Sequence, residues 1–156
     1  MALYLIQHGQ CHSKEQDPHK GLSDLGREQT AIIAGVAADY KVSVSTVAHS
    51  GKLRAQQTAE IFAGALKPEN GIQVISGIGP LDDVASFADS LPLDEDLMLV
   101  GHLPFMEKLI SFIVTGKEQP AIFQMQNSGI VCIDADPRTG KSIIKWTLMP
   151  RIGQVA

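Results

Sequence analysis

Long apolar runs are missing from this sequence, and no stretch approaches the roughly 20 apolar residues that a membrane-spanning helix needs. The amino terminus also lacks a basic segment followed by an apolar leader, because the chain enters an apolar strand directly. Cysteine is scarce: Cys11 and Cys132 are the two present, too few for a disulfide framework. These absences predict a cytoplasmic protein with reduced thiols.

An excess of basic charge is absent as well. The chain carries 13 lysines and arginines against 17 aspartates and glutamates, a net charge of -4. Nucleic acid and anionic membrane surfaces attract basic proteins, so neither is an expected partner. Any site for an anion must therefore be built locally. With 156 residues, 44% of them hydrophobic, and no internal repeat, we expect one domain spanning residues 1–156.

Strand and helix patterns alternate along most of the chain. Apolar or β-prone runs predict strands at residues 2–7, 43–48, 72–76, 97–100, 121–126, 129–134 and 142–148. Helical spacing with caps and stops predicts helices after Ser23, from Lys52 to Pro68, around residues 84–91 and from Pro104 to Gly116. This order predicts an α/β fold of three layers: a mostly parallel sheet with helices on both faces and an antiparallel carboxyl-terminal hairpin.

Two local expectations concern the region after the first strand. Residues 9–22 show no periodicity and form a long loop, which in compact domains is often functional. The first helix then places apolar residues at helical spacing on one face, which we expect to be the inward one. These residues are Leu25, Ile32, Ile33, Val36 and Tyr40.

Three predicted strands end near side chains suited to catalysis. The first strand stops at His8, the second runs into the segment that contains Arg54, and the strand at residues 97–100 precedes His102. Ligands of open α/β sheets bind beyond the carboxyl ends of the strands, so we expect these side chains to converge. The set suits a phosphoryl group, because an imidazole can attack phosphorus, a guanidinium matches phosphate oxygens, and a second imidazole can donate to developing charge. Taken singly, each residue also fits an ordinary structural role.

Two other groups of side chains offer alternatives. A metal site is one, but the spacing of its candidate ligands matches no standard zinc pattern, so no metal and no other cofactor is expected. Those ligands are His8, Cys11, His12 and His19. Asp82 and Asp83 follow the third predicted strand, where a carboxylate could act as a general acid. They could instead cap the helix that follows, which we favour slightly.

Four motifs in fixed order carry a family resemblance: Gln7-His8-Gly9, residues 21–29, residues 50–59 and residues 100–104. Together they resemble the histidine phosphatase superfamily, and the short chain is similar to its SixA-type phosphohistidine phosphatases. The resemblance covers nearly the whole length and implies a phosphoglycerate-mutase-like α/β sandwich. It also implies that His8 is the phosphorylated nucleophile, with Arg54 and His102 completing the phosphate pocket.

One position departs from the family motif. The family has Arg-His-Gly, whereas Gln7 precedes His8 here, so one phosphate-binding guanidinium is replaced by a neutral amide. Losing a transition-state donor typically costs about 10²–10³ in rate. The change is compatible with a weak phosphatase, another substrate, a binding protein, or compensation by another cation. The candidate cations are Lys20, Lys52 and Arg151.

The expected function is therefore that of a phosphatase with a phosphohistidine intermediate, acting on phosphohistidine in a protein. Gln7 leaves open a phosphate- or phosphoprotein-binding module with reduced or lost catalysis. A phosphomonoesterase or mutase acting on small phosphorylated substrates is a third alternative. A mutase must hold and reorient its substrate, for which the short loops offer little material.

Overall fold

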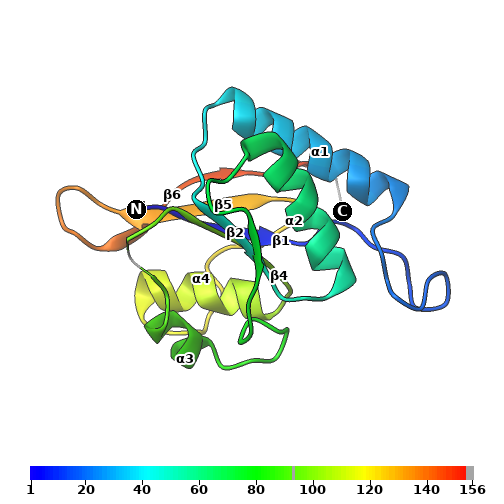
Figure 1. The fold of residues 1–156 in the computed structure, drawn as a ribbon. Helices are drawn as coiled ribbons and strands as arrows, with labels where there is room; N and C mark the ends of the chain where they lie inside the picture. Colours follow the sequence, from blue (N-terminus) through cyan, green and yellow to red (C-terminus); the bar gives the residue numbers. More distant parts are fainter. Residues whose placement is uncertain (93, 154–156) are drawn as a thin grey trace.

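Six strands form one sheet in the computed structural model of the chain, which describes residues 1–92 and 94–153 (Figure 1). They lie in the order β3-β2-β4-β1-β5-β6. The neighbours from β3 to β1 are parallel, whereas β5 is antiparallel to β1 and β6 is antiparallel to β5. The bounds are β1 Leu3–Gln7, β2 Thr46–His49, β3 Ile72–Val74, β4 Leu97–Gly101, β5 Ile130–Ala135 and β6 Ser142–Leu148.

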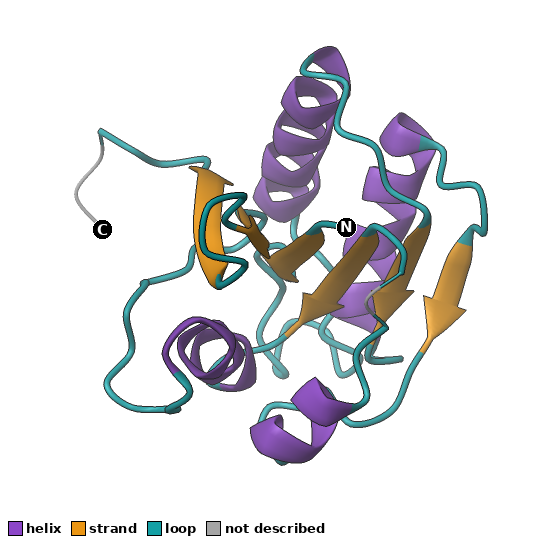
Figure 2. Ribbon diagram, turned by 90° about the vertical axis from the view of Figure 1, so that its left-hand side faces the viewer, coloured by secondary structure: helices purple, strands orange, loops and turns teal. Residues whose placement is uncertain are grey.

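Helices cover both faces of this sheet (Figure 2). Residues of α1 (Asp24–Asp39) and α2 (Leu53–Leu66) pack into one apolar cluster against the sheet. Residues of α3 (Val84–Asp89) and α4 (Phe105–Thr115) pack into a second cluster against the other face. The predicted three-layer α/β fold, with its mostly parallel sheet and antiparallel carboxyl-terminal hairpin, is confirmed.

The two central strands explain where the histidines lie. β4 is buried throughout, and so are the three middle residues of β1. Apolar strands without alternation are typical of a parallel sheet covered on both sides. Gln7 pairs with Gly101 at the end of the two strands. The residues that follow, His8 and His102, therefore leave the sheet side by side.

The inward face of α1 differs from the predicted one. Ile33 is buried as expected and Val36 is half-buried, but the prediction is wrong at three positions that are 48%, 56% and 79% exposed: Leu25, Ile32 and Tyr40. The other buried residues are small, namely Gly26, Thr30, Ala34 and Ala37. A Cβ on Gly26 would lie only 2.0 Å from the Gln10 carbonyl oxygen. The helix thus turns its small residues inward because it lies too close to its neighbours for large ones.

The predicted strand at residues 121–126 is wrong. This segment is irregular, and its backbone binds α4 instead of another strand. The Ile122 N–H donates to Ser111 Oγ (3.2 Å) and the Met125 N–H donates to Glu107 Oε2 (2.8 Å). The backbone N–H groups of this segment are thus committed to side chains of α4, and residues 121–126 pair with no strand of the sheet.

The ends of two helices follow the sequence pattern. Ser23 caps α1, because its Oγ accepts from the Gly26 N–H at 3.0 Å, and α4 ends at Gly116 as expected. Among the described residues, no helix combines the length and the apolar character needed to cross a membrane. The cytoplasmic location stays a prediction.

Candidate active site

The carboxyl ends of β2, β4 and β1 lie side by side at one edge of the sheet. The His8 backbone N–H donates to the Gly101 carbonyl oxygen at the end of β4 (3.0 Å). His102 comes directly after, and the centroids of the two imidazole rings are 5.1 Å apart. Arg54 lies in the first turn of α2, which follows β2. The predicted trio therefore belongs to one edge, and the two histidines face each other across it.

The imidazole of His8 is held in one tautomer. Its Nδ1 lies 2.7 Å from the Gly9 carbonyl oxygen, which can only accept, so Nδ1 carries the proton and donates. Nε2 then keeps its lone pair, the form needed to attack phosphorus. The pKa of His8 is lowered to about 4, chiefly by burial and to a smaller extent by the charges of Arg54 and Lys20, against the raising effect of the Gly9 hydrogen bond. His8 is neutral at pH 7.

Two residues without a role in the sequence analysis hold this turn in place. The Gly9 N–H donates to Thr58 Oγ1 in α2 (2.9 Å), and the Asn127 side-chain amide donates to the His8 carbonyl oxygen (2.8 Å). Thr58 lies inside the motif at residues 50–59, so a signal for it existed. Asn127 is 119 positions from His8 in the chain, and no local pattern points to it.

His102 is only 2% exposed and is bound on one side of its ring. Its Nε2 lies 2.6 Å from Ser50 Oγ, just after β2. Its Nδ1 is buried and has no hydrogen-bond partner among the described residues. Burial, followed by His8 and the charges of Arg54, Lys52 and Lys20, lowers the pKa of His102 to about 3. His102 is thus neutral at pH 7 and has one ring nitrogen left for a ligand.

Three cations give this edge a local positive charge in a chain whose net charge is -4. After burial and His8, the charges of Arg54, Lys52 and Lys20 lower the pKa of His102. Lys52 is the residue before α2 and Arg54 is in its first turn, where basic residues oppose the helix dipole. Their position there is explained if an anion binds between them.

Gln7 is the last residue of β1 and lies between Gly101 of β4 and Asn127, which precedes β5. Its carbonyl oxygen accepts from the Ser128 N–H (2.9 Å), whereas its side-chain Oε1 is buried and has no partner among the described residues. The backbone of Arg151, one of the candidate cations, pairs with the Gln126 side-chain amide at 3.0 and 3.1 Å. Of the candidate cations, Lys20 and Lys52 contribute to the lowered pKa of His102.

The two aspartates lie on the loop between β3 and α3. This loop passes the strand ends, because the Ile78 carbonyl oxygen would be 3.7 Å from a Cβ on Gly101. Asp82 accepts from the Gly79 N–H (2.7 Å) and so closes the loop. Asp83 takes the cap position of α3, but its carboxylate accepts from the Ser86 hydroxyl (2.5 Å) and not from the helix backbone. A general acid role for either stays a prediction.

The alternative metal ligands do not form a cluster in the part of the chain that the structure describes. Within residues 1–92 and 94–153, no group of three or more His, Cys, Asp or Glu side chains is placed to hold an ion. Cys11 pairs through its backbone with Leu22, and the His12 N–H donates to the Gly21 carbonyl oxygen (2.9 Å). These contacts close the loop after His8.

Comparisons with known proteins agree with this geometry. A family model described as histidine phosphatase superfamily (branch 1) matches residues 3–76. Phosphohistidine phosphatase SixA of Escherichia coli (strain K12) is 23% identical over 156 residues, covering 96% of this chain and 94% of that protein. An uncharacterized protein of Picosynechococcus sp. is 30% identical over 127 residues, covering 75% of each. The structure of the protein histidine phosphatase SixA complexed with tungstate has a TM-score of 0.80 at 22% identity and covers 96% of this chain and 97% of that chain.

Fold, paired histidines and matched sequence define one class of protein. The chain belongs to the histidine phosphatase superfamily. Within that family it is similar to SixA along nearly the full length of both chains. Membership supports a phosphatase activity.

Proposed function

We propose that this chain is a phosphatase in which Nε2 of His8 accepts the phosphoryl group of a phosphohistidine side chain on a protein. The observation that carries the proposal is the neutral imidazole of His8, with the proton on Nδ1 bound to the Gly9 carbonyl oxygen. A second imidazole, His102, lies beside it, and nearby cations act on both. A nucleophile within preorganised positive charge suits phosphoryl transfer.

The proposed reaction has two displacements. Nε2 of His8 attacks phosphorus while the bond from phosphorus to the substrate nitrogen breaks. The substrate ring, protonated on its other nitrogen, keeps that electron pair and leaves as neutral imidazole. Water then attacks phosphorus, the electron pair of the bond to Nε2 returns to His8, and the phosphate departs with both hydrogens of the water. His8 ends with its proton on Nδ1, as it began.

The choice of substrate follows from the acid that the site offers. Neutral imidazole is a good leaving group from a protonated phosphoimidazole, so cleavage of the phosphorus–nitrogen bond needs no strong general acid. Asp82 and Asp83 are exposed and bound to their own loop and helix. Either carboxylate becomes important only for a phosphomonoester, whose leaving oxygen needs a proton. The Escherichia coli relative is named a phosphohistidine phosphatase, which supports the same substrate class at 23% identity.

In the proposed site, other cations supply the positive charge of the arginine that Gln7 replaces. Gln7 contributes a neutral amide, and the charge comes from Lys20 and Lys52 together with Arg54. An ammonium group is a compact point charge and does not match two phosphate oxygens as a guanidinium does. We therefore expect turnover below that of a site with two arginines, not its loss.

Trapping of the intermediate tests chemistry and residue together. Incubation with a protein that carries labelled phosphohistidine should place acid-labile label on His8 and release inorganic phosphate. The His8→Ala variant should do neither. If the purified chain releases phosphate neither from a phosphohistidine protein nor from small phosphomonoesters, the proposal is wrong.

The replacement of the motif arginine by Gln7 favours a second candidate, a phosphate- or phosphoprotein-binding module that has lost turnover. Calorimetric titration with phosphate or tungstate, run beside the trapping experiment, separates the two. Binding with neither label on His8 nor phosphate release selects the module. Release of phosphate from small phosphomonoesters alone selects a small-molecule phosphatase, and a labelled isomerised product selects a mutase.

A further inference from the structure

Ser50, His102 and His8 form a row across three adjacent strand ends. Ser50 follows β2, His102 follows β4 and His8 follows β1. The Ser50 hydroxyl is 2.6 Å from His102 Nε2, and the two imidazole rings are 5.1 Å apart. Ser50 thus contacts the second histidine on Nε2, which leaves Nδ1 as the ring nitrogen without a partner among the described residues.

The backbone around Ser50 holds its side chain in position. Gly51 adopts a φ of +92°, a conformation that side chains rarely allow, and its N–H donates to His49 Nδ1 at 3.0 Å. The Lys52 N–H points at Ser50 Oγ from 3.4 Å. The turn is therefore defined on both sides of Ser50, and its hydroxyl oxygen already has one donor.

The direction of the bond to His102 follows from counting protons. A neutral imidazole carries one proton, on Nδ1 or on Nε2. Among the described residues, the acceptor within reach of the Ser50 hydroxyl proton is His102 Nε2. If Ser50 donates, the ring proton is on Nδ1, and Nδ1 can donate to a phosphoryl oxygen. In the opposite arrangement a bare lone pair on Nδ1 would be left for an anion, which is repulsive.

We propose that Ser50 is a positioning residue that donates to His102 Nε2 and so fixes the Nδ1–H tautomer, whose buried N–H binds a phosphoryl oxygen. The inference rests on the proposed function only in taking a phosphoryl group as the ligand. It also explains why Nδ1 has no partner among the described residues: the partner is the ligand. Ser50 itself does not attack phosphorus, because a ring that resists protonation is a poor base for its hydroxyl.

The experiment is nitrogen-15 NMR of the histidine rings at pH 7, with and without inorganic phosphate. The parent should show His102 protonated on Nδ1, and phosphate should shift that signal. Ser50→Ala should mix or reverse the tautomer and weaken phosphate binding at least about tenfold, the size of one hydrogen bond to a charged group. Ser50→Thr keeps the hydroxyl and should restore both.

Thr46→Val is the matched control. It removes a buried hydroxyl from the other end of β2, where Thr46 donates to Glu95 Oε2 at 2.9 Å. It should leave the His102 tautomer and phosphate affinity unchanged, whatever it does to stability. Any loss seen in Ser50→Ala and not in Thr46→Val is then specific to the contact with His102.

Two results would overturn the inference: a parent with the proton on Nε2 of His102, or an unchanged tautomer and affinity in Ser50→Ala. Neither measurement needs turnover. If the tautomer and phosphate results hold and no variant releases phosphate, the inference stands and the proposed phosphatase fails. If Ser50→Ala matches the parent in tautomer, affinity and turnover, the inference fails and the phosphatase stands.

Discussion

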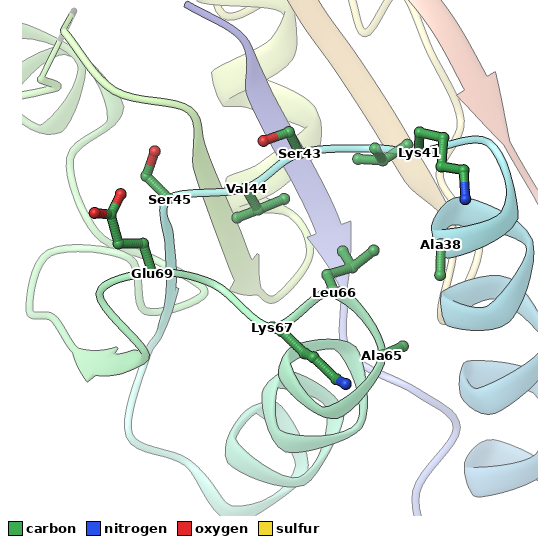
Figure 3. Close-up of a pocket in the computed structure, with 10 residues that line it drawn as sticks. Ala38, Lys41, Ser43, Val44, Ser45, Ala65, Leu66, Lys67 and Glu69 are labelled. Carbon is green, nitrogen blue, oxygen red and sulfur yellow. The ribbon is translucent and has the colours of Figure 1, made fainter.

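Basic residues lie at both ends of the strands of the sheet, near the histidines and at the opposite ends, yet the chemistry of these two edges differs. At the edge opposite the histidines, a hollow of about 420 Å³ lies beside the start of β2 (Figure 3). Lys41 and Lys67 line it together with Glu69. Lys41 follows the end of α1, and Lys67 caps the end of α2. At the histidine edge, Lys52 and Arg54 lie at the start of α2 instead.

This contrast shows that the end of the helix decides what a basic residue can do. At a carboxyl terminus the unpaired carbonyls are partly negative, so the field around Lys41 and Lys67 is less favourable for an outside anion. At an amino terminus the unpaired N–H groups are partly positive, so Lys52 and Arg54 add to a field that already attracts anions. The phosphate site is therefore expected at the histidine edge alone.

Removal of the nucleophile should have the largest effect and should be confined to one edge. His8→Ala is expected to abolish turnover while circular dichroism shows the fold unchanged, because a side chain beyond a strand end contributes little packing. Lys67→Ala at the opposite edge should turn over like the parent. Residual activity above about a tenth of the parent in His8→Ala removes His8 from the nucleophile role, since a lost nucleophile costs far more than that.

Removal of one cation from each edge compares them directly. Arg54→Ala should weaken tungstate binding by about 1.5–3 kcal/mol, the usual size of a hydrogen bond to a charged group, which is roughly 10- to 150-fold. Lys41→Ala should change the affinity by less than twofold. Titration calorimetry measures both. Equal losses in the two variants would mean that general surface charge, and not the helix start, binds the anion.

A gain should follow from sharpening the histidine edge. Gln7→Arg places a second guanidinium against the phosphoryl oxygens and should raise turnover about tenfold, for which about 1.4 kcal/mol of transition-state stabilisation is enough. Steady-state phosphate release measures it. If the ammonium group of Lys20 or Lys52 already lies where the motif guanidinium would lie, the new arginine is repelled by it, and the variant is no faster or is slower. That outcome beside an active parent shows a pocket rebuilt around Gln7.

The smallest expected effect is that the imidazoles of His8 and His102 do not titrate between pH 7 and pH 5. An unperturbed histidine titrates near about pH 6.5. His8 and His102, with burial lowering their pKa values to about 4 and about 3, should keep unchanged NMR signals from pH 7 to pH 5. Between about pH 6.5 and about pH 4 the unfolded chain binds protons that the folded chain does not. The free energy of unfolding should therefore decrease as the pH is lowered through this window. Signals that move near pH 6.5 contradict the buried neutral site.

Patterns along the chain predicted the features that depend on neighbours in sequence. The buried strands, the Ser23 cap and the position of His8 after β1 follow from local runs of residues. Features set by contacts between distant segments were missed. The backbone of the irregular segment at residues 121–126 binds side chains of α4, and the contact from Asn127 to His8 joins positions 119 apart.

The candidate site divides in the same way. The residue types at the strand ends indicated His8, Arg54 and His102, because each strand end could be located from its own run of residues. The tautomer of His8 depends on one carbonyl oxygen, and the contact of Ser50 with His102 depends on which strand lies next to which. Gly9 is adjacent to His8 in sequence, but whether its carbonyl turns toward the imidazole depends on the backbone conformation there. The contact of Ser50 with His102 joins two neighbouring strand ends, and such pairing leaves no local spacing in the sequence.

The central place of β1 also bears on how the chain acquires its shape. Leu3 pairs with Leu97 on one side and with Ile133 on the other. The pairing of β1 in the sheet therefore requires β4 and β5, which are synthesised much later. Contacts between such distant positions close large loops and slow the search for the native state. β2 pairs with β4 and not with β1, so a nascent chain that ends before β4 lacks the strand that joins β1 to β2 in the sheet. Contacts between loop and helix, such as that from Gly9 to Thr58, are left to link the two segments. The edge that carries His8, the proposed nucleophile, is therefore complete only after β4 and β5 have joined β1.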